Sequence, residues 1–184
     1  MSTADSLHAA IGAWTRALGE AHVRTDEETL ERYSRTTQDT APRPACILFP
    51  ESTAQVQEIV RIAGRHGAVV YPISRGRNWG YGDACAPTPG AAIVDLSRMN
   101  QILEVNTELA YAVIQPGVTQ GQLYEYLAEH ETGLWMDSTG AGPEASLVGN
   151  TLDRGFGHTR YGDHFETCCG MEVVLADGRV LETG

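Results

Sequence analysis

The fold is decided by one stretch of the sequence, residues 72–82, which reads PISRGRNWGYG. It follows an apolar run and contains three glycines and two arginines. Glycine allows positive φ angles, so successive backbone amides can converge on one anion, and arginine adds bidentate contacts to a phosphate. The stretch predicts a diphosphate-binding loop, although an ordinary turn-rich loop with solvated arginines has the same composition. It matches neither G-x-G-x-x-G opening a helix nor G-x-x-x-x-G-K-[ST], which disfavours the common nucleotide-binding folds.

Two helices are predicted before this loop. Apolar residues recur at helical spacing over residues 7–18 and predict an amphipathic helix that Gly19 ends. Thr25 and Glu28 form a capping-box pattern, so we expect a second helix from there to about Tyr33.

A strand, a helix and another strand lead directly into the loop. The apolar run 46–49 predicts a strand, and Ser52 or Thr53 then caps a helix that ends at Gly67. Residues 68–71 are predicted as the next strand. This order is a β-α-β unit of the kind that makes parallel strand pairing.

The sequence after the loop is richer in strands. Residues 91–96 and 110–115 predict strands, and Thr119 with Gln122 opens a helix. A Gly-, Pro- and Ser-rich segment covers 137–149, and Asp177-Gly178 signals a two-residue hairpin turn between two final strands. No internal repeat is present. The predicted class is α+β, with a small β-α-β lobe followed by a second, more sheet-rich lobe.

Composition excludes several functional classes. The chain has 184 residues, of which 42% are hydrophobic, so it can build a core. Its 24 acidic residues against 13 basic ones give a net charge of -11, which argues against a nucleic-acid partner. We expect a cytoplasmic protein, because no signal peptide or membrane-spanning segment is evident. The four cysteines have no metal-ligand spacing and are expected to be reduced structural thiols, with Cys168 and Cys169 on opposite faces of a strand.

Several motifs in order carry a resemblance to a known family. Residues 73–82 resemble the flavin diphosphate loop of the vanillyl-alcohol oxidase / p-cresol methylhydroxylase family, I-S-x-G-[RK]-N-x-G-Y-G. Similar matches follow at 93–106, 111–119, 146–164 and 170–178. The resemblance covers roughly Pro42 to Gly184 and implies FAD as cofactor. It implies a helical lead-in over residues 1–41 and, over 42–184, a p-cresol methylhydroxylase-type FAD-binding domain of two α/β lobes. We expect the second lobe to be incomplete and the C-terminal part and the substrate domain to be absent.

The resemblance assigns two groups of residues to the cofactor. The first loop would offer backbone amides to the diphosphate, with Arg75 or Arg77 adding charge. The second segment would wrap the flavin from the other side, where small residues let the backbone approach the ring; a loop without function is the alternative. The implied cofactor-binding residues are Pro72, Ile73, Ser74, Arg75, Gly76, Arg77, Asn78, Gly80, Gly142, Ser146, Leu147, Gly149, Asn150, Gly157, Tyr161 and Gly162.

Two residues match catalytic positions of the family. Tyr81 would bind a substrate phenolate, which eases loss of hydride to flavin N5; by itself it could equally be a packing anchor. Asp163 would lie near N5 as a base or electrostatic stabiliser, although an aspartate in a polar turn is more often a helix cap. His158 and His164 are not assigned as bases. Some relatives link the flavin through a histidine in the loop, but the corresponding residue here is Asn78.

The resemblance therefore predicts an FAD-dependent oxidoreductase acting on a para-substituted phenol or aromatic alcohol. The expected partners are a phenolic small molecule, a cytochrome or oxygen as electron acceptor, and a second copy in a full-length homodimer. The alternatives are a 2-hydroxy-acid or sugar-alcohol oxidoreductase of the same fold, and a non-catalytic FAD-binding fragment. No metal site is predicted.

Overall fold

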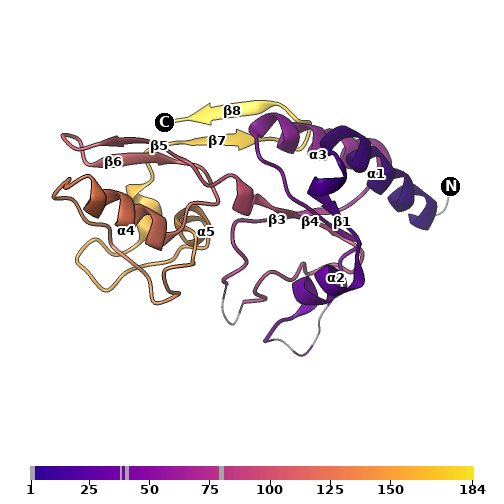
Figure 1. Cartoon of the computed structure of the whole chain (residues 1–184), viewed down its shortest axis with the longest axis horizontal. Helices are drawn as coiled ribbons and strands as arrows, with labels where there is room; N and C mark the ends of the chain where they lie inside the picture. The colour runs from indigo at the N-terminus through magenta and orange to yellow at the C-terminus, as the bar shows by residue number, and fades with distance from the viewer. Residues whose placement is uncertain (1–2, 38, 40–41, 79–80) are drawn as a thin grey trace.

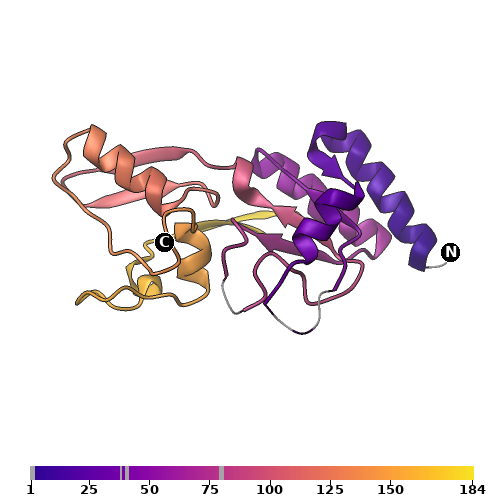
Figure 2. The same cartoon turned by 60° about the horizontal axis from the view of Figure 1, so that its bottom comes forward.

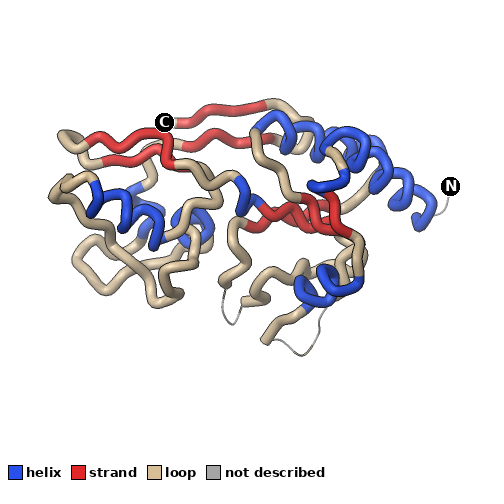
Figure 3. The backbone as a smooth tube through the Cα atoms, viewed as in Figure 1, coloured by secondary structure: helices blue, strands red, loops and turns tan. Residues whose placement is uncertain are grey.

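The computed structural model describes residues 3–37, 39, 42–78 and 81–184. The chain forms two lobes side by side, an N-terminal lobe built on a four-stranded sheet and a second lobe with two-stranded sheets (Figure 1, Figure 2). Helices and strands are mixed along both lobes (Figure 3). The α+β class and the two-lobe arrangement are confirmed.

The N-terminal lobe is organised by one mixed sheet. Its strand order is β1 (Val23–Arg24), β2 (Cys46–Leu48), β4 (Ala92–Asp95), β3 (Val70–Ile73). β4 lies between β2 and β3 and is parallel to both, whereas β1 is antiparallel to β2. The predicted β-α-β unit therefore contributes two parallel strands to this sheet, although they do not pair directly, because the next strand of the chain inserts between them.

Helices cover both faces of this sheet. α1 (Thr3–Leu18) and α3 (Thr53–His66) pack on one face together with Cys46, Leu48, Ala92 and Val94. α2 (Glu27–Ser34) lies on the other face with Ile47, Ala91 and Ile93. Alternate strand residues thus enter opposite cores, as the pleat of a strand requires. The buried Trp14 indole N–H also donates to the Ile59 carbonyl oxygen at 3.1 Å, which ties α1 to α3.

The helix ends follow the capping signals with one correction. Ser52 caps α3 by accepting from the Gln55 amide, and Gly67 ends the helix in the left-handed conformation. The cap of α2 is Asp26, whose carboxylate accepts from the Thr29 amide, and the prediction of Thr25 was wrong by one position. Both residues are good caps, and the aspartate also pairs with Arg24 at 2.8 Å.

The second lobe follows a short connection. That connection is the 3₁₀ helix η2 (Leu96–Arg98). Another 3₁₀ helix, η1 (Glu20–His22), precedes β1 in the first lobe. Then come β5 (Ile102–Asn106) paired with β6 (Tyr111–Ile114), α4 (Gln120–Glu129), α5 (Leu147–Leu152) and η3 (His164–Thr167). The predicted capping box of Thr119 and Gln122 is present in full at the start of α4.

A C-terminal hairpin completes the described chain. β7 (Met171–Val174) pairs with β8 (Val180–Thr183). The hairpin is confirmed, but its turn was wrongly predicted as two residues: the Gly178 amide donates to the Leu175 carbonyl and the Leu175 amide to the Arg179 carbonyl. Gly178, at φ 81°, supplies the left-handed residue of a three-residue loop. The Gly178 carbonyl accepts from Gln57 and Arg61 of α3, which holds the hairpin on the first lobe.

All four cysteines are free thiols. Cys46 is buried in the sheet, and burial raises the pKa of its thiol to about 12. The sequence predicted Cys168 and Cys169 on a strand, and this was wrong. Both residues lie between η3 and β7. Among the described residues, no helix is long and apolar enough to cross a membrane, and no three His, Cys, Asp or Glu side chains gather as a metal site.

Thiol labelling tests this packing. We expect Cys169, which is exposed, to react with a thiol reagent in the native chain, whereas Cys46 reacts only after unfolding because its thiolate is disfavoured by burial. Labelling with iodoacetamide followed by peptide mass spectrometry, with and without denaturant, separates the two sites. Equal labelling of both in the native state would contradict the position of Cys46.

Candidate functional site

The predicted diphosphate loop begins where β3 ends. β3 is the edge strand of the described sheet. This position suits Pro72, since proline has no N–H to donate to a further strand. The side chain of Ile73 is only 9% exposed and lies in the core below the loop. Only backbone atoms of Ile73 are therefore available to a cofactor. The carboxyl end of a parallel strand is also where ligands bind in open α/β sheets.

The amides of residues 74–78 form the first part of this loop. Within the described part of the chain, none of the backbone amides from Ser74 to Asn78 donates a hydrogen bond. Gly76 has a φ of 62°, and a Cβ placed on it would lie 2.6 Å from the Cβ of Ala84. Glycine is thus required at this bend. Unpaired successive amides around a left-handed glycine are the geometry of an anion nest.

The second predicted segment lies against this loop. Ser146 caps α5 by accepting from the Gly149 amide at 2.8 Å. A Cβ placed on Gly149 would lie 3.3 Å from Ser74 Oγ and 2.7 Å from Ser146 Oγ. The structure therefore brings the two predicted cofactor segments into contact, although they are far apart in the sequence. The Leu147 amide is already used, because it donates to the Val118 carbonyl at 3.2 Å.

The two loop arginines differ in their surroundings. The guanidinium of Arg75 lies 3.6 Å from the Glu144 carboxylate and 3.5 Å from the Ser97 carbonyl oxygen, so it bridges the loop and the second segment. Arg77 is exposed. Part of the charge of Arg75 is offset locally, which leaves Arg77 as the more available cation.

The 137–149 segment is ordered by a buried glutamine that sequence reasoning missed. Gln120, only 4% exposed, donates to the Gly142 carbonyl at 2.9 Å and accepts from the Thr139 amide at 2.8 Å. Gly142 itself has a φ of 87°. The segment is therefore held in place from α4. The available sequence signal was the position of Gln120 at the start of that helix, next to the capping Thr119.

Asn150 and Gly157 contact a pair of side chains that the sequence did not predict to meet, His164 and Asp137. Nδ1 of His164 lies 2.7 Å from Oδ1 of Asn150, and its Nε2 lies 3.4 Å from Asp137 Oδ2. A Cβ placed on Gly157 would lie 2.0 Å from Asp137 Oδ1, so only glycine fits there. No local sequence pattern marks this cluster, because its members come from separate segments.

The two predicted catalytic residues lie in different segments of the chain. Asp163 caps η3 by accepting from the Phe165 amide at 2.8 Å, and its other oxygen lies 3.3 Å from Arg154. The Arg154 guanidinium in turn stacks on the Phe165 ring at 4.3 Å. The Tyr81 side chain is 80% exposed, and only its backbone amide contacts a predicted site residue, by donating to the Asn78 carbonyl at 3.1 Å.

The remaining predicted residues are placed as follows. Tyr161 lies beside Trp135, with ring centroids 5.9 Å apart, and Gly162 follows it with a φ of 65°. Gly80, predicted to bind the cofactor, and its neighbour Trp79 lie outside the described residues.

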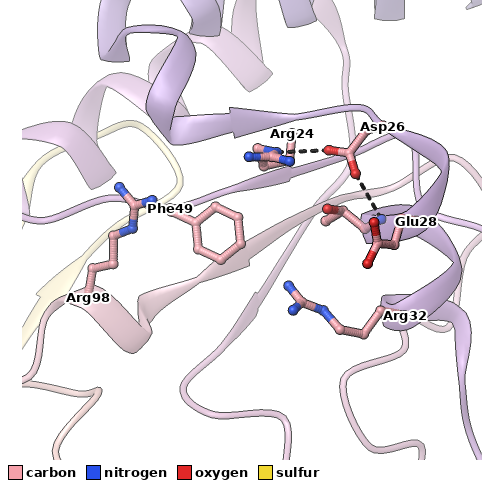
Figure 4. Close-up of a pocket in the computed structure, with 7 residues that line it drawn as sticks. Arg24, Asp26, Glu28, Arg32, Phe49 and Arg98 are labelled. Carbon is pink, nitrogen blue, oxygen red and sulfur yellow. Dashed lines mark hydrogen bonds and ion pairs between the residues drawn. The ribbon is translucent and has the colours of Figure 1, made fainter.

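A separate cleft of about 340 Å³ lies over α2 and β1 in the first lobe (Figure 4). Its charges are largely paired: Arg24 binds Asp26 at 2.8 Å, and Arg98 binds Glu51 at 3.0 Å while stacking on the Phe49 ring. None of the predicted site residues lines it. The candidate site is therefore the contact between the 74–78 loop and the start of α5.

The residues of that contact fit a dinucleotide diphosphate. The unpaired amides offer donors, Gly76 leaves no room for a side chain against Ala84, and Gly149 leaves little room against Ser74 where loop and helix approach. A diphosphate needs both features, since it binds through backbone N–H groups at close range.

Comparison with known proteins agrees with this fit. A family model described as "FAD binding domain" matches residues 44–184. The chain is 44% identical to 1'-carboxy-chondrochloren decarboxylase of Chondromyces crocatus, covering 97% of the chain and 33% of that protein. It is 37% identical to the 4-cresol dehydrogenase flavoprotein subunit of Pseudomonas putida, covering 99% of the chain and 36% of that subunit.

Solved structures show the same relationship. The chain superimposes on p-cresol methylhydroxylase with substrate bound at a TM-score of 0.94 and 37% identity, over 98% of the chain and 36% of that structure. It matches 4-ethylphenol oxidase from Gulosibacter chungangensis in its isoeugenol complex at a TM-score of 0.94 and 40% identity, over 98% of the chain and 35% of the other. The chain thus spans about a third of the length of these relatives. It belongs to the vanillyl-alcohol oxidase / p-cresol methylhydroxylase family of flavoproteins and carries the FAD-binding domain of that family.

Proposed function

We propose that the amides of Ser74–Asn78 bind the diphosphate of FAD and that the full-length protein oxidises a para-substituted phenol or aromatic alcohol. One observation carries the binding proposal: the unpaired loop amides lie against the glycine-opened start of α5. The relatives named 4-cresol dehydrogenase and 4-ethylphenol oxidase support the substrate class.

The loop supplies most of the binding energy through its backbone. A chain of net charge -11 repels a diphosphate at long range, so local donors must offset that repulsion. Arg77 adds a guanidinium from the loop, and Arg75 adds a second one that Glu144 partly neutralises. When bound, FAD supplies the hydride acceptor of the reaction.

Asp163 and Tyr81 are the proposed residues for the substrate. Asp163 offers a carboxylate that can accept a proton at Oδ2, the oxygen that lies 3.3 Å from the Arg154 guanidinium. The Tyr81 hydroxyl is exposed and able to donate a hydrogen bond to a phenolate oxygen. Together they would lower the barrier by stabilising charge on the phenol as the carbon–hydrogen bond breaks.

Two other functions are kept as alternatives. The chain is 37% identical to D-2-hydroxyglutarate dehydrogenase of Stutzerimonas stutzeri over 87% of its length, which favours a 2-hydroxy acid as the second substrate class. The other alternative is that the chain binds FAD without catalysing a reaction. A substrate panel of 4-alkylphenols and D-2-hydroxy acids, with flavin reduction followed by absorbance, distinguishes the three.

The first prediction concerns the loop charges. Arg75→Ala together with Arg77→Ala should weaken FAD binding about tenfold or more, because charge-assisted bonds to a phosphate contribute roughly 1.5–3 kcal/mol before screening. Titration of the chain with FAD, followed by flavin fluorescence, measures this. The control is Arg35→Ala with Arg179→Ala, which removes the same charge from exposed ion pairs elsewhere. If both double variants lose the same amount of FAD affinity, the net charge of the chain determines binding and not the position of the arginines in the loop.

The second prediction concerns the contact between the two segments. Gly149→Ala should lower FAD affinity by at least about tenfold, because the new methyl group would push α5 away from Ser74. Gly64→Ala is the matched control: Gly64 lies in α3 with no atom within 4 Å of the added Cβ. That change should leave FAD binding unchanged and stabilise the helix by up to about 1 kcal/mol. If Gly149→Ala keeps the wild-type affinity for FAD, the contact between Gly149 and Ser74 is not part of the cofactor site.

The third prediction concerns catalysis by the full-length protein. Asp163→Ser should slow flavin reduction by a 4-alkylphenol by about 10²-fold or more, while FAD binding is retained, because serine keeps the cap of η3 but not the charge. Stopped-flow absorbance measures the reduction step. Asp153→Ser, at an exposed position at the end of α5, serves as the control and should react at the wild-type rate.

A further inference from the structure

A carboxylate and an imidazole face each other inside the second lobe. The side chains of Asp137 and His164 are only 9% and 13% exposed, and their Oδ2 and Nε2 atoms lie 3.4 Å apart. Within the described residues, neither atom has a hydrogen-bond partner. An unpaired carboxylate in such a place is costly, so these two groups must compensate each other.

The His164 ring lies between two polar side chains. Oδ1 of Asn150 lies 2.7 Å from its Nδ1. The carboxylate of Asp137 faces its Nε2 at 3.4 Å. One imidazole therefore joins α5 to the segment that precedes it.

We propose that His164 is a positioning residue which clamps Asp137 and Asn150 together and thereby fixes the Asp163 turn beside the cofactor. The clamp itself follows from the contacts above, whereas its effect on FAD rests on the proposed function. His164 does not act as a base in this role. It acts through Asn150 and Asp163, its neighbours in space and in sequence.

Backbone bonds connect the ring to both neighbours. The His164 amide donates to the Gly155 carbonyl at 3.1 Å, and the Gly155 amide donates to the Asn150 carbonyl at 2.8 Å. An isolated bridge between Phe156 and Asp163 closes the same turn. Loss of the buried ring would release this turn, and with it the direction of the Asp163 carboxylate.

Glycine positions around the cluster show that it is tightly packed. A Cβ on Gly155 would lie 2.0 Å from the Asn150 amide nitrogen, and a Cβ on Gly157 would lie 2.0 Å from the Asp137 carboxylate. No side chain fits between the clamp and the 155–157 backbone. Small displacements of Asp137 or Asn150 are therefore transmitted to that backbone.

The contacts of the His164 ring can be measured by NMR without FAD. In the ¹⁵N-labelled chain, Asp137→Asn should shift the ring-nitrogen signals of His164, because the carboxylate faces that ring. The signals of His158, which is exposed, should stay in place. Unchanged His164 signals in Asp137→Asn would overturn the clamp.

A double-mutant cycle tests the coupling. Asp137→Asn and His164→Gln should each lower the urea midpoint of unfolding, and the double variant should lose less than the sum of the two, because each single change strands a buried partner. Additive losses would contradict the pairing. The control pair Asp153→Asn and His158→Gln lies on the exposed surface nearby and should show neither a loss nor coupling.

FAD titration of the same variants tests the positioning role. If the wild-type chain binds FAD, His164→Gln should bind it at least about tenfold more weakly under conditions where circular dichroism shows it folded; unchanged affinity in that folded variant would overturn the positioning role. If the wild-type chain binds no FAD, the proposed cofactor site fails. The NMR signals and the unfolding cycle still decide the clamp in that case, because both are recorded without FAD.

Discussion

The close approach of the Gly149 backbone to Ser74 is the constraint on which the candidate site depends. It brings a loop from the edge of the first sheet against the start of a short helix in the second lobe, so that the two predicted cofactor segments touch. Three side chains support this contact. Ser146 caps the helix, Gln120 fixes the segment before it, and Arg75 bridges to Glu144 across it. A side chain at Gly149 would crowd Ser74 and Ser146 at this contact.

Electrostatics reinforce the importance of backbone donors. The chain is strongly acidic, and many of its thirteen arginines are committed to carboxylates, as Arg24 is to Asp26 and Arg98 to Glu51. Few positively charged side chains are therefore left to bind an anion here. Backbone amides are not neutralised by nearby acids, and an anion nest remains effective in an acidic protein. The same reasoning applies inside the second lobe, where Asp137 faces His164 and not solvent.

Sequence alone predicted the features that depend on local pattern. Helical spacing, the Thr119 capping box and the glycine-rich loop all act within a few residues, and the structure contains the elements that they indicate. Thr25 was preferred over Asp26 because Glu28 follows it at capping-box spacing, whereas in the structure the Asp26 carboxylate caps the helix and also pairs with Arg24. The place of β4 between β2 and β3 depends on pairing across the sheet, which no local pattern encodes. Gln120 and the Asp137–His164 pair were missed for the same reason, since their partners come from distant segments.

The hydrogen bonds from Gln57 and Arg61 to the Gly178 carbonyl have a mechanical consequence. Covalently, the lobes are joined at Leu96–Arg98, and a single connection would act as a pivot. The β7–β8 hairpin extends from the second lobe back to α3 and makes a second point of attachment (Figure 1). A second attachment at a distance from the first leaves rotation possible only about the line that joins the two. The hairpin therefore limits how far the lobes can turn apart at the contact between Ser74 and Gly149.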